Sequence, residues 1–121
     1  MTKSGHVFTP VKTVNYESLV ALSYQNADGV NFEDAPVSVY ILATFPIPKS
    51  TSKKKLSDII REKVFPTKKP DCDNIAKAVC DALNGVAWRD DSQVVELSVA
   101  KRYTQYQPTV HVTIEELPDD H

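Results

Sequence analysis

Side chains alternate between apolar and more polar types in three stretches of the chain, and each alternation predicts a strand. The clearest stretch is residues 37–45, where every second side chain is apolar. The positions between are also fairly apolar, so this strand is expected to be central and covered by helices on at least one face. Residues 93–103 and 109–115 are joined by a short loop containing Pro108, which predicts an antiparallel hairpin. The opening G-H-V-F-T-P, closed by Pro10, is expected to be a further short strand or arm.

Apolar residues recur at helical spacing in three other stretches, which predicts helices at 14–27, 51–64 and 74–84. Asp73 or Asn74 is the expected N-cap of the third helix, and Asn84-Gly85 is expected to end it. On the second helix, the side chains expected to be buried are Leu56, Ile59, Ile60 and Val64. On the third helix, they are Ile75, Val79, Ala82 or Leu83, and Val86.

The composition is that of an ordinary globular protein, with 121 residues, 41% of them hydrophobic and 25% charged. The predicted elements indicate an α/β (α+β) fold in a single domain, 1–121. Its mixed sheet would have about three to four strands, with the C-terminal hairpin, and about three helices would pack on it. No apolar run approaches the roughly 18 residues that span a bilayer, and the N-terminus lacks an apolar signal region. The expected location is cytoplasmic, without a membrane partner.

Charge is distributed unevenly along the chain. The net charge is −2, yet eight basic residues lie between Lys49 and Lys69, against Asp58 and Glu62. A chain of this kind can present a positive face although its total charge is negative. The segment is interpreted either as a solvated helix face or as a surface that contacts phosphates. The cysteines form no C-x-x-C pair and the three histidines are scattered, so a zinc site is not indicated and free thiols are expected.

Asp71 and Asp73 lie two positions apart, immediately before the third predicted helix. In an extended segment they would project to the same side, and Cys72 would point the other way, into the core. Two aligned carboxylates repel each other unless a cation lies between them, and Mg²⁺ usually takes one or two carboxylates plus water. The alternative is that Asp73 caps the helix and Asp71 is solvated. Lys77 follows one turn later, placed either for a surface ion pair or for a phosphate.

A second acidic pair, Asp90-Asp91, precedes the strand at 93–103. One of these acids is expected to approach the metal and the other to serve the turn. Trp88 is interpreted as packing, Arg89 as a contact to a backbone phosphate and Asp81 as structural. No glycine-rich phosphate loop is present, so no nucleotide cofactor is expected. The sequence also lacks an EF-hand pattern and a Ser-His-Asp pattern.

The stretch K-P-D-C-D-N-I-A-K-A-V-C-D-A-L-N-G-V-A-W-R-D-D-S-Q-V-V-E closely resembles the signature of the RusA family of Holliday-junction resolvases. The shared pattern is D-x-D-N-x-x-K, then D-A-L, then D-D-[SA]-Q-[VI]-V. The resemblance implies a small α/β homodimer, a crossover junction endodeoxyribonuclease that makes paired nicks in four-way DNA junctions with Mg²⁺, or with Mn²⁺ in its place. Family members usually begin with a further strand before the G-H-V-x-T-P element, so this chain is expected to lack that first strand.

Carried over residue by residue, the resemblance implies Asp71, Asp73 and Asp91 as metal-binding acids and Lys77 as the catalytic lysine, with Asp90 the less certain member of its pair. The basic residues expected to contact DNA are Lys53, Lys54, Lys68, Lys69 and Arg89. The resemblance implies a protein that acts in DNA recombination and repair and is encoded by a phage or prophage. Two alternatives stay open: a junction-binding protein that no longer cuts, and a less selective Mg²⁺-dependent nuclease acting on branched DNA.

Overall fold

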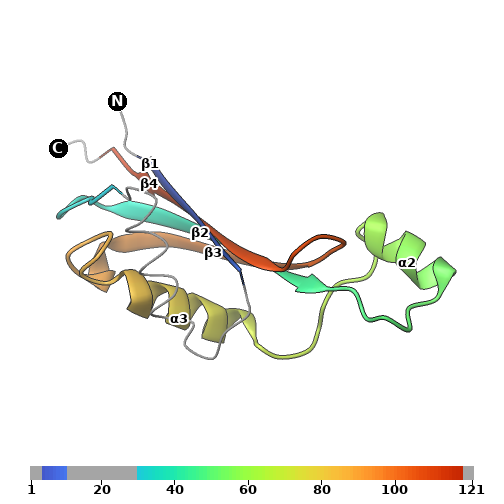
Figure 1. Ribbon diagram of the computed structural model, residues 1–121. Helices are drawn as coiled ribbons and strands as arrows, with labels where there is room; N and C mark the ends of the chain where they lie inside the picture. The colour runs from blue at the N-terminus through green and yellow to red at the C-terminus, as the bar shows by residue number, and fades with distance from the viewer. Residues whose placement is uncertain (1–3, 11–29, 119–121) are drawn as a thin grey trace.

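The computed structural model describes residues 4–10 and 30–118, so the helix predicted at 14–27 lies outside the described residues. Figure 1 shows a twisted sheet with helix α3 across one face, while helix α2 lies apart from the sheet, beyond the end of strand β2. The elements are β1 (Ser4–Pro10), β2 (Val37–Pro46), α2 (Lys53–Ile60), α3 (Cys72–Leu83), the 3₁₀ helix η1 (Asp91–Gln93), β3 (Val94–Thr104) and β4 (Thr109–Glu116).

The sheet is mixed, with the strand order β1-β4-β2-β3. Strand β2 is central, as predicted, and pairs in parallel with β3 and antiparallel with β4. The predicted hairpin is wrong in its pairing, because β2 lies between the two C-terminal strands although they run in opposite directions. The long connection that carries α2 and α3 brings β3 parallel to β2. The Thr44 hydroxyl then holds the start of β4 on the other side of β2, accepting from the Thr109 amide at 2.9 Å.

The core lies between α3 and one face of the sheet. The alternation in β2 and β4 buries every second side chain on that face, and α3 contributes one apolar stripe. Burying a Val, Ile or Leu side chain contributes roughly 1.5–3 kcal/mol relative to leaving it exposed. The buried side chains are Phe32, Val37, Val39, Ile41, Ala43, Ile75, Val79, Ala82, Leu83, Ala87, Trp88, Val110, Val112 and Ile114. The predicted inward face of the third helix is therefore confirmed, with Val86 partly buried against this cluster, and Trp88 is confirmed as a packing residue.

Helix α2 is shorter than the predicted 51–64. Ser52 is its N-cap, and the Ser52 hydroxyl accepts a hydrogen bond of 3.2 Å from the backbone amide three residues later. The helix ends early because Glu62 adopts a left-handed backbone conformation with φ +58°. Of the predicted apolar stripe, Ile59 is buried but Ile60 is 54% exposed, since α2 does not pack on the sheet.

Helix α3 begins two residues earlier than predicted. Asp71, rather than Asp73 or Asn74, occupies the N-cap position with extended φ −73° and ψ 157°, so Asp73 lies inside the first helical turn. The prediction that both acids lie on one extended segment is therefore wrong. Cys72 is the first helical residue and is exposed, which also corrects its predicted role in packing. An aspartate is as good an N-cap at position 71 as at 73, and acidic side chains are favoured throughout a first turn.

Asn84 and Gly85 end α3, as predicted, and Gly85 provides the left-handed turn with φ +79°. Both cysteines are free thiols in the structure, which confirms that expectation. In the described part of the chain, no helix has the length and apolar character needed to cross a membrane.

Candidate active site on helix α3

The first turn of α3 presents two carboxylates to solvent. Asp71 and Asp73 are both exposed, and the Asp71 side chain makes no capping hydrogen bond to the described helix. Their oxygens are therefore open to ligands. A hydrated Mg²⁺ takes one or two carboxylates and completes its octahedral shell with water and phosphate oxygens. This pair fits that requirement by ligand type and accessibility.

Lys77 lies one turn further along the same helix. The ion pair that the structure describes for its ammonium is with Asp81, one turn further on, at 3.7 Å. The two side chains are 78% and 40% exposed, so the pair contributes only about 0.3–0.5 kcal/mol. Such a weak contact leaves Lys77 available to a phosphate bound near the first turn.

The two adjacent acids of the second pair have different environments. Asp90 is the N-cap of η1, where its carboxylate accepts hydrogen bonds from the Ser92 amide at 3.0 Å and from the Ser92 hydroxyl. These hydrogen bonds lower the pKa of Asp90. The Gln93 side chain completes the capping box by accepting from the Asp90 amide at 2.8 Å. Asp90 thus serves the turn.

Asp91 is half-buried. The indole Nε1 of Trp88 donates a hydrogen bond to Asp91 Oδ1 at 2.9 Å. Burial, and next the negative charges of Asp91 and Asp81, raise the pKa of the Cys80 thiol to about 11. Asp91 therefore lies near the C-terminal half of α3. Cys80 is seven residues beyond Asp73, which corresponds to about 10 Å along a helix axis.

The structure thus places Asp71 at the N-cap and Asp73 in the first turn of α3, while Asp91 lies in η1, after the loop that follows α3. Among the described residues, no three His, Cys, Asp or Glu side chains gather closely enough to hold a metal ion. The set of three metal-binding acids stays a prediction, and the pair at the start of α3 offers exposed carboxylates of the type that Mg²⁺ takes.

The lysines predicted to contact DNA are all exposed. Lys53 and Lys54 begin α2, while Lys68 and Lys69 directly precede α3. Arg89 follows α3 at its other end, and its guanidinium pairs with Asp34 at 3.1 Å. A helix of 12 residues is about 18 Å long, so Arg89 is separated from the lysines before α3 by roughly that length.

Two further cations near these lysines were missed as candidates. Lys101 Nζ donates to the Lys68 carbonyl at 2.7 Å, and the Arg102 guanidinium lies 4.9 Å from the centre of the Phe65 ring. Both residues are at the end of β3, which becomes the neighbour of segment 62–68 only after β3 pairs with β2. The sequence signal for them is two adjacent basic residues followed by Tyr103, near the end of the predicted strand 93–103. These contacts fix the basic segment to the sheet.

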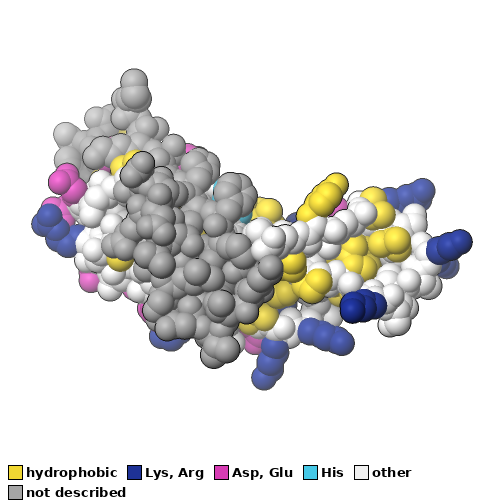
Figure 2. All heavy atoms as spheres, viewed as in Figure 1, with side chains coloured by type: hydrophobic (Ala, Val, Ile, Leu, Met, Phe, Trp, Pro, Cys, Tyr) yellow, Lys and Arg dark blue, Asp and Glu magenta, His cyan; other side chains and the backbone are white. Residues whose placement is uncertain are grey.

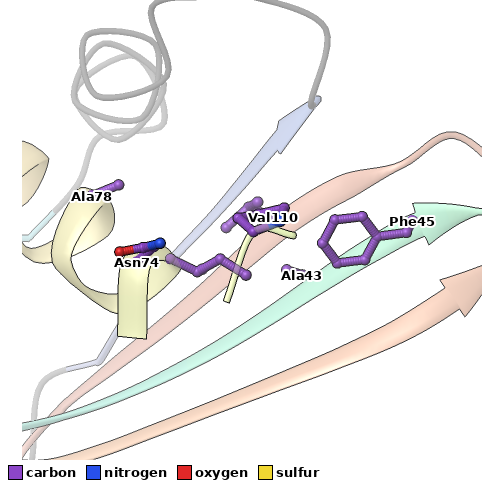
Figure 3. Close-up of a pocket in the computed structure, with 7 residues that line it drawn as sticks. Ala43, Phe45, Asn74, Ala78 and Val110 are labelled. Carbon is purple, nitrogen blue, oxygen red and sulfur yellow. The ribbon is translucent and has the colours of Figure 1, made fainter. Parts of the chain in front are cut away.

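A pocket of about 210 Å³ opens between the start of α3 and the sheet. Figure 3 shows Asn74 and Ala78 of α3 facing Ala43, Phe45 and Val110 of the sheet. Its lining is apolar apart from Asn74, with no charged group to bind a phosphate. The pocket itself therefore offers no charged side chain for a metal ion or a phosphate.

Comparison with known proteins matches the chain to a family and to a relative. Residues 1–115 match the family described as endodeoxyribonuclease RusA. The chain is also 40% identical over 114 residues to the uncharacterized protein YqaN of Bacillus subtilis (strain 168), an alignment covering 93% of this chain and 80% of that protein. The family match includes all four predicted catalytic residues, at positions 71, 73, 77 and 91.

Proposed function

Because the chain belongs to the RusA family of endodeoxyribonucleases, we propose that it resolves four-way DNA junctions by metal-assisted hydrolysis of phosphodiester bonds. The family resemblance seen in the sequence is confirmed, and the family implies a branched DNA substrate. The observation that supports the proposed chemistry best is the exposed pair Asp71 and Asp73, with Lys77 one turn further along the same helix.

In this proposal Asp71 and Asp73 hold Mg²⁺, or Mn²⁺ in its place. A metal ion held there would supply Lewis-acid stabilisation of the phosphate and a water of lowered pKa. The weakly paired ammonium of Lys77 contacts a phosphate oxygen and stabilises the negative charge that develops in the transition state. Asp91 is kept as the third acid on the family resemblance, with one of its oxygens oriented by Trp88.

Two copies of the chain in a C2 homodimer would carry two such sites, matching the two-fold symmetry of a junction and allowing paired nicks. The exposed lysines before α3 and on α2 would hold the DNA arms through salt-sensitive phosphate contacts. The proposed biological setting is recombination and repair in a phage or prophage.

The experiment that tests this function compares a four-way junction with a linear duplex of the same sequence, each incubated with Mg²⁺ or with EDTA. Paired nicks in the junction, formed only with Mg²⁺, are expected. Junction binding without nicks under any divalent ion would favour the binding protein that no longer cuts. Equal cutting of the linear duplex would favour the less selective nuclease.

A further inference from the structure

Three large apolar side chains are exposed around α2 and the β3–β4 turn. Ile60 is 54% exposed, Phe65 is 43% exposed and Tyr106 is 85% exposed. Figure 2 shows hydrophobic side chains gathered over this end of the molecule, with Lys and Arg side chains around them. These three residues are called the apolar arm patch below.

Two sets of contacts connect the residues of the patch to the end of β3. Arg102 lies 4.9 Å from the Phe65 ring and 4.0 Å from the Glu62 carboxylate, which fixes the segment after α2 against the strand. Tyr106 follows Arg102 by four residues, and its backbone amide donates to the Thr104 hydroxyl at 3.0 Å. The turn backbone is thus anchored while the Tyr106 ring projects into solvent.

Basic residues are numerous in the segment that carries Ile60 and Phe65. The exposed basic residues of this region are Lys49, Lys53, Lys54, Lys55, Arg61, Lys63, Lys68 and Lys69. Lys101 adds a further ammonium 5.6 Å from the centre of the Phe45 ring. An apolar surface with an aromatic ring at its tip and a rim of positive charge is complementary to a polyanion that also offers flat apolar faces.

We propose that the apolar arm patch stacks on base pairs exposed at the branch point of a DNA junction and thereby sets the preference for branched over linear DNA. This inference rests on the proposed function, which supplies branched DNA as the substrate. A linear duplex offers phosphates to the lysines, but its base faces are covered by their neighbours. A branch point exposes base faces, on which an aromatic side chain can stack without reading sequence.

The patch also lies close to the candidate active site along the chain. Phe65 precedes Asp71 by six residues, and the intervening Lys68 carbonyl is tied to Lys101 at 2.7 Å. A branch point held on the patch would therefore place one DNA arm along the basic segment that leads to the first turn of α3. The patch would position the junction, while the acids would act on its backbone.

The test measures equilibrium binding of a four-way junction and of a linear duplex of the same sequence in EDTA, so that no cleavage occurs. Tyr106→Ala is expected to weaken junction binding by about tenfold while duplex binding stays unchanged. Tyr106→Phe, which keeps the ring, is expected to bind as the wild type does. Gln107→Ala is the matched control, because Gln107 is exposed in the same turn but has no ring.

Two further measurements separate stacking from charge and from assembly. The dependence of duplex affinity on salt is expected to be unchanged in Tyr106→Ala, since no phosphate contact is removed. A 2-aminopurine placed at the branch point is expected to lose fluorescence on binding the wild type but not Tyr106→Ala. Light scattering is expected to give the same mass for both proteins; a smaller mass for the variant would make the patch a protein interface and overturn the inference.

The remaining binding outcomes separate failure of the proposed function from failure of this inference. A wild-type protein that binds the junction no more tightly than the duplex would contradict both the proposed function and this inference. A wild-type preference for the junction that persists in Tyr106→Ala would overturn the inference alone. Equal weakening on both DNAs would also overturn it, because stacking at a branch point cannot act on a continuous duplex.

Discussion

Trp88 Nε1 donates a 2.9 Å hydrogen bond to Asp91 Oδ1, joining a fully buried indole to one of the predicted catalytic acids. Trp88 packs in the core beside α3, so the position of this carboxylate depends on the packing of the fold. The neighbouring Asp90 is instead held by the local hydrogen bonds of a capping box. The two adjacent acids therefore have separable roles, one oriented by the core and one closing a turn.

Asp91→Asn is expected to abolish junction cleavage, lowering the rate by about 100-fold or more, because the neutral amide removes an acid of the proposed site. The amide oxygen still accepts from Trp88, so the free energy of unfolding is expected to change by less than about 1 kcal/mol. Single-turnover cleavage and urea unfolding measure the two effects. Asp90→Asn is the matched control and should retain cleavage, because Asn is also a good N-cap. The reverse pattern would assign the chemistry to Asp90.

A second matched pair lies on the exposed face of α3. Asp73→Asn is expected to bind the junction normally but to give no nicks in Mg²⁺, because one of the two carboxylates at the first turn is lost. Asp81→Asn removes a carboxylate of the same helix that pairs with Lys77 and is not one of the proposed metal ligands, so cleavage should persist. Gel assays for binding and nicking on the same samples distinguish the two. Unchanged nicking by Asp73→Asn would contradict the assignment of the metal site.

Much of this fold could be predicted from the sequence, since its strongest patterns are local. Strand β2 was placed to within one residue, because proline follows an unbroken alternation. The buried face of α3 was also correct, as its apolar spacing has a single helical solution. The hairpin was wrong in its pairing because alternation identifies a strand but not its neighbour. That choice depends on β2, which takes β3 and β4 on opposite sides.

The candidate site likewise has one part that local sequence patterns predict and one part that depends on tertiary folding. Asp71, Asp73 and Lys77 lie at the start of one helix, which could be anticipated from the sequence, although the helix begins earlier than expected and the two acids do not share an extended segment. The place of Asp91 could not, because it depends on how the loop after α3 folds back. Gly85 donates from its amide to the Trp88 carbonyl at 2.8 Å, closing that loop and carrying Asp91 to the C-terminal half of the helix.

Cys80 provides a chemical probe of the Asp91 environment. Burial and the nearby negative charges raise the pKa of its thiol to about 11, so the reactive thiolate is scarce below that pH. With iodoacetamide at pH 8, exposed Cys72 is expected to react rapidly and Cys80 slowly, with Cys80 accelerating as the pH approaches 11. Peptide mass spectrometry separates the two sites. Asp91→Asn should accelerate Cys80 only in part, because burial is the larger cause; no change would place Asp91 away from this thiol.

The raised pKa of Cys80 also predicts how stability depends on pH. The folded state holds the thiol proton more tightly than the unfolded chain, so the contribution of Cys80 to stability is complete below pH 9 and is lost as the pH rises toward about 11. Urea unfolding across this range is expected to show a decline that is smaller in Cys80→Ala. An identical decline in both proteins would mean that other groups cause it.

The basic residues before and after α3 are expected to contribute differently to DNA binding. Replacing both Lys68 and Lys69 with alanine should weaken junction and duplex binding alike. The slope of log affinity against log salt concentration should become shallower by about two, because each exposed lysine gives up one phosphate contact.

Arg89 tests how far the DNA extends, since it lies at the opposite end of the helix and pairs with Asp34 at 3.1 Å. If DNA follows the whole of α3, Arg89→Ala lowers the slope by about one. If DNA stays at the first turn and the arm, the slope is unchanged, and Arg89 is a structural partner of Asp34 alone. Affinity measured from about 50 to 200 mM salt distinguishes the two paths.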